Sequence, residues 1–281
     1  MDLQFLVREY PESNTKTKAE KKGIYAGGPA TNAAIGFSYA GGMAQLYAAI
    51  GIHPFREFII NDVQNAGVEI IDLIPDKMNE PVFATIITSK NSGDRTIFSY
   101  HPTIQPAIEN INGNPLEIPE IALFDGFYIK TAIHFAGKLK ANNVPVVFDG
   151  GSWKKGMEEF LPLVDIAICS HDFYPPGTST KKDVIKYLEN KNISKIAITR
   201  GDQPVLFKSP EHSGEIYVED TDVQDTLGAG DFFHGAFCCY YAHGDTFVEA
   251  LRKAAEVATE SCKSFGTRTW LKKEENKDEQ K

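Results

Sequence analysis

Residues 225–237 read DTLGAGDFFHGAF, and this stretch decides both the fold and the chemistry expected of the chain. The small residues Gly228, Ala229 and Gly230 predict a tight turn, and the apolar run after them predicts a buried helix. The first turn of such a helix has free backbone N–H groups and a partial positive charge, so it attracts an anion. Asp231 follows directly, where a carboxylate is able to accept a proton from a hydroxyl group beside that anion hole.

The same residues also fit a purely structural role. Glycine turns before helices are common, and an aspartate in the first helical turn stabilises the helix. The stretch is not a Walker A loop, because no Gly-Lys-Ser or Gly-Lys-Thr follows, and it lacks the third glycine of a dinucleotide fingerprint. A catalytic role and a capping role for Asp231 are therefore both open on these residues alone.

The composition is that of a globular protein, with 42% hydrophobic and 24% charged residues among 281. A length of this size allows one large α/β domain or two small ones. The net charge of −9 argues against nucleic acid and anionic membrane surfaces as partners. An anionic ligand must then be held by local dipoles and a few cations.

The four cysteines show no metal-binding or paired spacing, which indicates free thiols in a reducing compartment. Charged residues interrupt the opening of the chain, so it does not read as a signal peptide, and no apolar run reaches the ~20 residues that span a bilayer. The sequence predicts a cytoplasmic protein.

Strand and helix patterns alternate in the second half of the chain. Apolar strands are expected at residues 144–149, 166–170 and 195–199, with helices at 133–142, 181–190 and 247–264. Such alternation predicts a three-layer αβα fold with a mainly parallel central sheet, and ligands at the carboxyl ends of its strands.

A β-hairpin is expected earlier in the chain, because two β-branched runs, 82–88 and 95–100, flank a turn at 90–94. We expect this hairpin to belong to a small β-sheet lid. The predicted divisions are an α/β core at residues 27–78 and 106–271, the lid at 2–26 and 79–105, and a disordered tail at 272–281.

The stretch at 225–233 resembles the C-terminal signature of the ribokinase family, the PfkB-type carbohydrate kinases, which reads roughly Asp-Thr-x-Gly-Ala-Gly-Asp-x-Phe. A second family motif, Gly-Gly with an asparagine four residues on, stands at Gly28 and Asn32. Stretches 51–55, 93–96 and 199–201 resemble further family elements in the family's order. Within the family, the ketohexokinase-like and sulfofructose-kinase-like branches are the nearer candidates.

This resemblance implies an enzyme that uses ATP and Mg²⁺ to phosphorylate a hydroxyl of a small sugar. Asp231 would be the general base, and the backbone of Gly228, Ala229 and Gly230 the anion hole. K⁺ near Asp225 and a homodimer formed through the lid are further implied features. The residues implied for substrate are Asp2, Gly27, Gly28, Asn32 and Arg95, and those implied for ATP are Thr199, Gly201 and Ala255.

Several of these residues also have simpler interpretations. Gly27, Gly28 and Asn32 fit a plain helix start, and Arg95 fits a solvated charge on a hairpin. His234, one helical turn after Asp231, fits a packed core histidine rather than a ligand.

The chain departs from the family pattern in three places. The family opens with a core strand that ends in a sugar-binding aspartate, whereas Asp2 has no such strand before it; a misassigned start and a truncated chain are both open interpretations. The family's Asn-x-x-Glu element is replaced by SHDF at residues 170–173. The region near the adenine reads AAE at residues 254–256, which predicts mainly apolar contacts with the base.

Two alternatives to a sugar kinase follow from these departures. One is a nucleoside or vitamin kinase of the same fold, which would need an apolar pocket for a ring near Asn32. The other is a catalytically inactive protein that senses a sugar or nucleotide. The intact residues 228–231 argue against inactivity, because a protein without activity has no need to keep the base.

Overall fold

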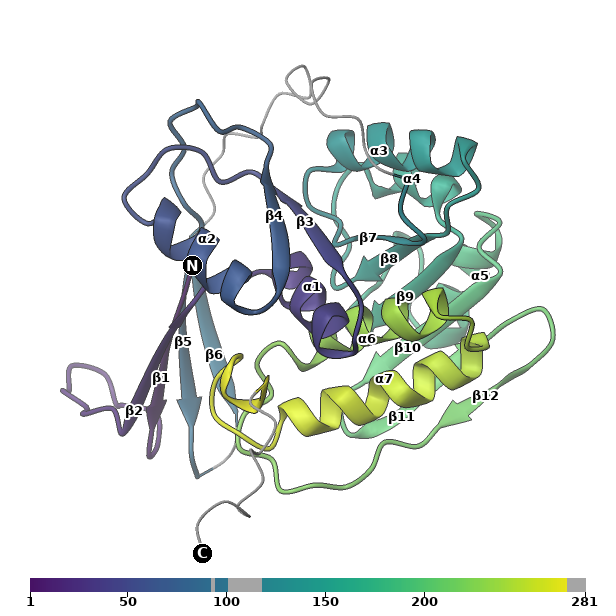
Figure 1. The fold of residues 1–281 in the computed structure, drawn as a ribbon. Helices are drawn as coiled ribbons and strands as arrows, with labels where there is room; N and C mark the ends of the chain where they lie inside the picture. The colour runs from purple at the N-terminus through teal and green to yellow at the C-terminus, as the bar shows by residue number, and fades with distance from the viewer. Residues whose placement is uncertain (92–93, 101–117, 272–281) are drawn as a thin grey trace, which may run out of the picture.

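The computed structural model describes residues 1–91, 94–100 and 118–271 of the chain, and Figure 1 shows how they are arranged. A small sheet built from early strands lies beside an α/β body, with helices α1 and α6 near the middle of the view. The tail expected at residues 272–281 lies outside the described residues. None of the helices in the described ranges is long and apolar enough to cross a membrane.

A six-stranded sheet forms the body, in the order β12-β11-β10-β9-β8-β7. Strands β7 to β10 run parallel, and β11 and β12 extend the sheet in antiparallel fashion. The mainly parallel sheet predicted from the alternating pattern is therefore confirmed. The strand bounds are β7 Ala122–Phe124, β8 Val146–Gly150, β9 Ile166–Ser170, β10 Lys195–Arg200, β11 Gln203–Lys208 and β12 Ser213–Ile216.

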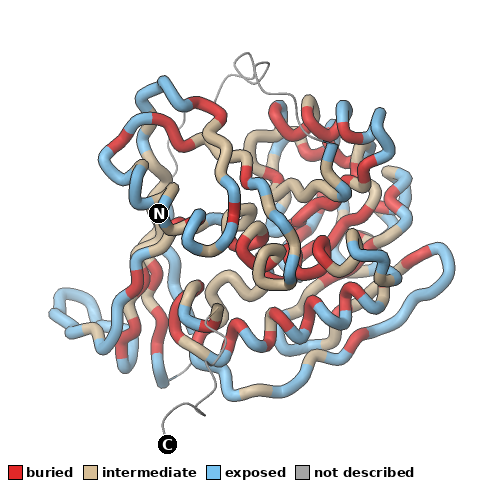
Figure 2. The backbone as a smooth tube through the Cα atoms, viewed as in Figure 1, coloured by how far each residue is buried: buried red, intermediate tan, exposed pale blue. Residues whose placement is uncertain are grey.

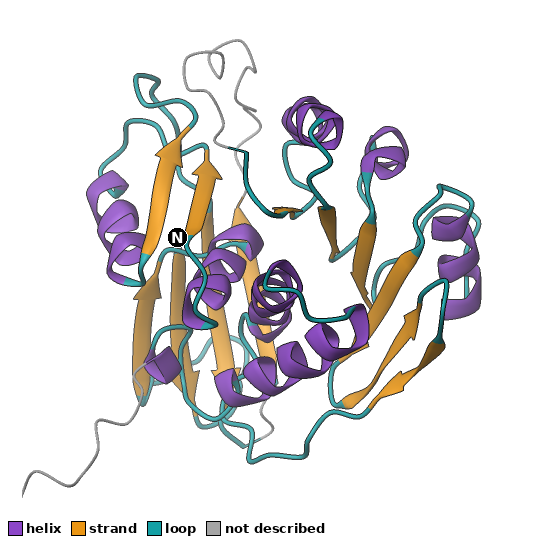
Figure 3. Ribbon diagram, turned by 45° about the vertical axis from the view of Figure 1, so that its right-hand side comes forward, coloured by secondary structure: helices purple, strands orange, loops and turns teal. Residues whose placement is uncertain are grey.

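Helices cover both faces of this sheet, as Figure 3 shows, which gives the expected three layers. Neighbouring side chains of one strand enter opposite cores: Val147 packs in the core that contains α6 and α7, and Phe148 in the core that contains α3 and α5. All five residues of β8 are buried for this reason. The helix bounds are α1 Pro29–Tyr39, α2 Arg56–Asn65, α3 Ile129–Ala141, α4 Met157–Phe160, α5 Lys181–Glu189, α6 Ala229–Ala242 and α7 Phe247–Ser261.

Helices α1 and α6 cross at very short range, because each carries a glycine at the contact. A Cβ on Gly235 of α6 would lie 1.8 Å from the carbonyl oxygen of Ala33, and a Cβ on Gly36 of α1 would lie 2.9 Å from that of Phe232. Side chains larger than hydrogen therefore do not fit at either position without a shift of the helices. This crossing fixes how the two helix N-termini lie relative to each other.

Two further parallel strands, β3 (Ala44–Ala48) and β4 (Val68–Asp72), form a separate two-stranded sheet in the described part of the chain. A cavity of about 1080 Å³ has residues of β3, such as Tyr47, and of β7, such as Phe124, among its lining. The sequence predicted one central sheet. In the described residues, β3 and β4 are instead separate from the six-stranded sheet, and the cavity is bordered by residues of both sheets.

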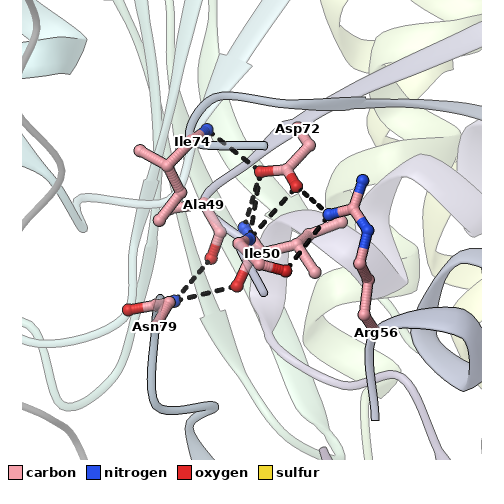
Figure 4. Close-up of polar contacts among 7 residues, drawn as sticks. Ala49, Ile50, Arg56, Asp72, Ile74 and Asn79 are labelled. Atoms are coloured by element: carbon pink, nitrogen blue, oxygen red, sulfur yellow. Dashed lines mark hydrogen bonds and ion pairs between the residues drawn. The ribbon is translucent and has the colours of Figure 1, made fainter. Parts of the chain in front are cut away.

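A buried carboxylate orders the loop that leaves β3 (Figure 4). Asp72 accepts hydrogen bonds from the backbone N–H groups of Ile50, Gly51 and Ile74, and forms an ion pair with Arg56. Gly51 has φ +71°, and a Cβ there would lie 2.6 Å from the Lys77 carbonyl oxygen. The stretch at 51–55 thus keeps its shape through one carboxylate and one glycine in the left-handed region.

The sheet that the sequence predicted as a lid, and which keeps that name below, has four strands in the order β2-β1-β5-β6. The predicted hairpin is confirmed, because β5 and β6 pair antiparallel from Phe83–Tyr100 to Thr88–Arg95. Figure 2 shows the buried residues concentrated in the body, whereas every residue of β6 is exposed. The strand bounds are β1 Asp2–Val7, β2 Lys21–Tyr25, β5 Phe83–Ser89 and β6 Arg95–Tyr100.

Candidate active site

The N-termini of α1 and α6 meet at one end of their crossing and bring two predicted residues together. Asn32, in the first turn of α1, donates a hydrogen bond from Nδ2 to Oδ2 of Asp231, in the first turn of α6, over 2.9 Å. Glycines in the left-handed region precede both helices, with φ +104° at Gly28 and +77° at Gly228. Both helix dipoles therefore end beside the same carboxylate, which makes this place attractive to a phosphate.

The turn at 225–230 is held from several sides. The Asp225 carboxylate is buried and accepts from Leu227 N (3.0 Å), Gly266 N (2.9 Å) and Gln4 Nε2 (2.6 Å). Arg95, on lid strand β6, contacts the hydroxyl of Thr226. The first N–H groups of a helix have no carbonyl partner within it, and at α6 the Ala229 N–H donates instead to the Thr226 carbonyl oxygen of the turn, over 3.3 Å.

Asp2 lies beside the glycine pair before α1. Its carboxylate comes so close to Gly27 that a Cβ there would lie 2.0 Å from Oδ2. Burial raises the pKa of Asp2, and the Met1 ammonium and Arg268 oppose that shift. Gly27 and Gly28 thus leave room for the acid at the start of β1. These three of the five predicted substrate residues border the same cavity, whereas Asn32 and Arg95 are not among its lining residues.

The electrostatic surroundings of Asp231 suit a general base. Burial raises the pKa of this half-buried carboxyl to about 7, and the nearby Asp149 adds to the shift, while the Asn32 hydrogen bond and His234 oppose it. An aspartate that titrates near neutrality accepts a proton far better than one with an ordinary pKa near 4. Perturbed carboxyls of this kind gather at functional sites.

A second layer of acids lies behind Asp231 at the carboxyl ends of β7 and β8. Burial raises the pKa of both Asp125 and Asp149. Asp125 accepts from Phe127 N (3.0 Å) and from Ala30 N at the start of α1 (3.4 Å). His234 is buried, as expected of a core histidine, with Nε2 3.5 Å from Oδ1 of Asp149.

The residues expected to bind nucleotide lie on β10 and α7. Thr199 is near the end of β10, with its hydroxyl 3.4 Å from the Cys169 carbonyl oxygen. Gly201 has φ +66° and open space around it, whereas Ala255 is only 6% exposed within the core that α7 forms. No described hydrogen bond links these three residues to Asp231.

Two polar residues of the site were not anticipated. Arg268 follows α7 in a segment without a recognisable motif, yet it donates to Asn32 Oδ1 over 3.3 Å. Asp125 directly follows a strand of three residues, which is too short to stand out by its periodicity. Its position at a strand end was the available signal, as it was for Asp149.

In the segment 170–173, which replaces the family's Asn-x-x-Glu element, His171 and Asp172 are exposed and Phe173 is buried. Asp172 lies 3.1 Å from Nε2 of His171, and both side chains are open to solvent. Among the described residues, no group of three or more His, Cys, Asp or Glu side chains is placed to hold a metal ion.

Comparison with known proteins gives a consistent result. The model of the family described as "pfkB family carbohydrate kinase" matches residues 1–274. A nucleoside kinase of Methanocaldococcus jannaschii is 25% identical over 252 residues, which is 87% of this chain and 81% of that protein.

Solved structures show the same fold. A protein from Agrobacterium tumefaciens assigned as a ribokinase superposes with a TM-score of 0.82 at 23% identity, over 96% of this chain and 90% of that one. A protein from E. coli assigned as a ribokinase II, in complex with ATP and Mg²⁺, has a TM-score of 0.77 at 16% identity, over 96% and 92% of the two chains.

Replacing Asp231 by asparagine should stabilise the protein at alkaline pH. A carboxyl whose pKa rises on folding stabilises the fold below its unfolded pKa near 4, and this contribution is lost as the pH rises through about 7. Asp231→Asn removes the ionisable group, and with it the loss of stability at high pH, while the side chain keeps nearly the same shape. We expect its gain in unfolding free energy to be about 2 kcal/mol larger at pH 8 than at pH 5.

Urea unfolding of both proteins at the two pH values measures this difference. The exposed Asp222, on the loop before the turn, provides the matched control, and Asp222→Asn should give equal changes at both pH values. An Asp231→Asn gain that does not depend on pH would show that the Asp231 carboxyl titrates normally.

Proposed function

The chain belongs to the pfkB family of carbohydrate kinases and is a kinase, and from this premise we propose that it transfers the γ-phosphoryl group of ATP to a hydroxyl of a small sugar. The observation that carries the proposal is the Asp231 carboxyl, whose pKa is raised to about 7 at the N-terminus of α6. A base and an anion site in contact with each other are what phosphoryl transfer to an alcohol requires.

Asp231 is the proposed general base. Its Oδ2 accepts from Asn32, so Oδ1 is the oxygen proposed to accept the proton of the substrate hydroxyl. The O–H bond breaks as the hydroxyl oxygen bonds to the γ-phosphorus, and the bond from that phosphorus to the bridging oxygen of ADP breaks in line. Positioning of the two reactants supplies much of the rate, because the transferred group needs little covalent help.

The turn at 228–230 is the proposed anion hole. Its backbone N–H groups and the dipole of α6 would stabilise the charge on the phosphoryl oxygens during transfer. Mg²⁺ supplies charge neutralisation when it is bound to the nucleotide. The described residues fit it only as an ion carried by the phosphates, because they offer no cluster of three ligands.

Nucleotide and cation contacts complete the proposal. Thr199 and Gly201 are proposed to contact ATP at the end of β10, and Ala255 to contribute the apolar surroundings of its base. The K⁺ expected near Asp225 would have to bind backbone carbonyls, because the Asp225 carboxylate already accepts from three N–H groups. We therefore propose that the Asp225 carboxylate stabilises the turn at 225–230 and does not bind the cation.

Substrate selection is proposed to lie with the groups around the glycine pair. Asp2, Asn32 and the backbone of Gly27 and Gly28 provide donors and acceptors suited to sugar hydroxyls. The adjoining cavity, however, is lined by aromatic residues such as Phe127 and Tyr128, which favours a substrate with an apolar ring. A nucleoside is therefore the second candidate, in line with the nucleoside kinase relative.

Phosphoryl transfer from ATP to a panel of ketoses, aldoses, sugar phosphates and nucleosides tests the function. We expect turnover with one class, and a loss of roughly 10²–10⁴-fold in Asp231→Asn, the usual contribution of a general base. Asp222→Asn is the matched control and should retain full turnover. Full turnover in Asp231→Asn would remove this residue as the base, and ATP binding without turnover of any acceptor would favour the sensing role.

We also propose a homodimer formed through the lid, in the cytoplasm. Large apolar side chains are exposed on the edge strands of the lid sheet, including Phe98 (66%) and Tyr100 (56%) on β6 and Ile24 (44%) on β2. Exposed apolar side chains on sheet edges favour pairing with another chain. The four cysteines are buried free thiols, which suits a reducing compartment.

Light scattering after size exclusion tests the dimer. Phe98→Glu places a charge on the exposed face of β6 and should convert a dimer of the unaltered protein into monomers. Met43, which is 98% exposed outside the lid, provides the control, and Met43→Glu should remain dimeric. A monomeric unaltered protein, or a Phe98→Glu variant that stays dimeric, would contradict the proposal.

A further inference from the structure

Arg268 is a buried cation that the proposed reaction does not use. Its side chain is 13% exposed and donates in several directions. Nη2 donates to the Ala26 carbonyl oxygen over 2.6 Å and to Asp62 Oδ2 over 2.9 Å, and Nη1 donates to Asn32 Oδ1 over 3.3 Å. Asp62, on α2, also accepts from Ala26 N over 2.9 Å, so the arginine is fixed at its far end.

The contact with Arg268 determines which way the Asn32 amide faces. A guanidinium only donates hydrogen bonds, so the group of Asn32 that meets it must be the carbonyl oxygen. The NH₂ group then points the other way, where it donates to Asp231. A flipped amide would place its oxygen against the Asp231 carboxylate and its NH₂ against the arginine, and both contacts would be lost.

We propose that Arg268 is a positioning residue, which acts through Asn32 to hold the Asp231 carboxylate in place and to stabilise its ionised form. The chain of contacts runs from Asp62 through Arg268 and Asn32 to Asp231. This inference rests on the proposed function of Asp231, but the orientation of the amide is a property of the structure itself.

The charged groups around Asp231 offer a second route from Arg268, and its effect has the opposite sign. Asp149 and Asp2 raise the pKa of Asp231, whereas His234 and the Asn32 amide lower it. Arg268 lowers the pKa of Asp2. Without the arginine, Asp2 would be neutral more readily and would raise the pKa of Asp231 less. A rise in the pKa of Asp231 on loss of Arg268 therefore reports the route through the asparagine.

The Cζ atom of Arg268 lies 5.7 Å from the centroid of the Tyr25 ring. The guanidinium of Arg268 also forms an ion pair with Asp62. Burial lowers the pKa of Arg268 and Asp62 opposes the shift, but a guanidinium keeps its charge at any physiological pH. The cation is thus a permanent donor, and it does not act as a pH switch.

The test is a double-mutant cycle read by the titration of the Asp231 carboxyl carbon in NMR spectra. Arg268→Met should raise the pKa of Asp231 by about one unit, the size of effect that a single hydrogen bond to a carboxylate supports. Asn32→Ala should give a similar rise, and the double variant no more than Asn32→Ala alone. Once the acceptor is known, the acidic limb of kcat/KM should move by the same amount.

An unchanged pKa in Arg268→Met, or shifts that add up in the double variant, would overturn the inference. Arg56→Met is the matched control, because it also removes an arginine ion-paired with an aspartate, and it should leave the pKa of Asp231 unchanged. Arg268→Lys serves if the methionine variant does not fold. It keeps the charge beside Asp62 but lacks the planar fork, so the pKa should still rise.

The titration needs no turnover, so the two proposals fail separately. Full activity of Asp231→Asn would remove the general base, while the titration would still report whether Arg268 acts on Asp231 through Asn32. An uncoupled titration together with an inactive Asp231→Asn would remove only the role of Arg268.

Discussion

The close crossing of α1 and α6 is the contact on which the rest of the site depends. Gly36 and Gly235 let the two helix backbones approach to a distance that no side chain larger than hydrogen permits. Their N-termini therefore end together, and Asn32 meets Asp231 although 199 residues separate them in the sequence. A wider crossing would separate Asp231 from its hydrogen-bond donor, and the turn at 228–230 from the glycine pair.

The raised pKa of Asp231 implies a local cost in stability. Burying Asp231 near Asp149 disfavours its ionised form, and the Asn32 hydrogen bond offsets this only in part, since the pKa is still about 7. A protein selected for stability alone would place a neutral side chain here. The surrounding structure is well placed to bear the cost, because α6 is buried from Phe232 to Cys239.

The lid sheet is connected to the turn at 225–230 by two contacts. Gln4, fully buried in β1, donates to both Thr88 of β5 and Asp225 of the turn. Arg95 of β6 reaches Thr226 in the same turn. The arginine predicted to meet a substrate anion, with a solvated charge as the alternative, thus contacts the turn itself. A displacement of the lid sheet would therefore act on the turn at 225–230 through these side chains.

Elements that are determined by neighbouring residues were predictable from the sequence, whereas contacts between residues far apart in the chain were not. Residues 225–237 carry their own turn and helix start, and β5 and β6 their own alternation and turn, so both were anticipated. Arg268 joins Asn32 across 236 residues, and nothing in its neighbours indicates that. The division into two parallel-stranded parts depends on which strand edges meet, which the strand pattern does not determine.

The turnover number of Gly36→Ala tests the central claim most directly. Alanine favours the helix at this position, so only the contact with the Phe232 backbone opposes it. Gly137 in α3 is the control, because a Cβ there meets nothing within 4 Å. We predict that Gly36→Ala stays folded but loses about tenfold or more in kcat, since small displacements of reacting groups are costly. Unchanged turnover in a folded Gly36→Ala variant would show that the site does not depend on this crossing.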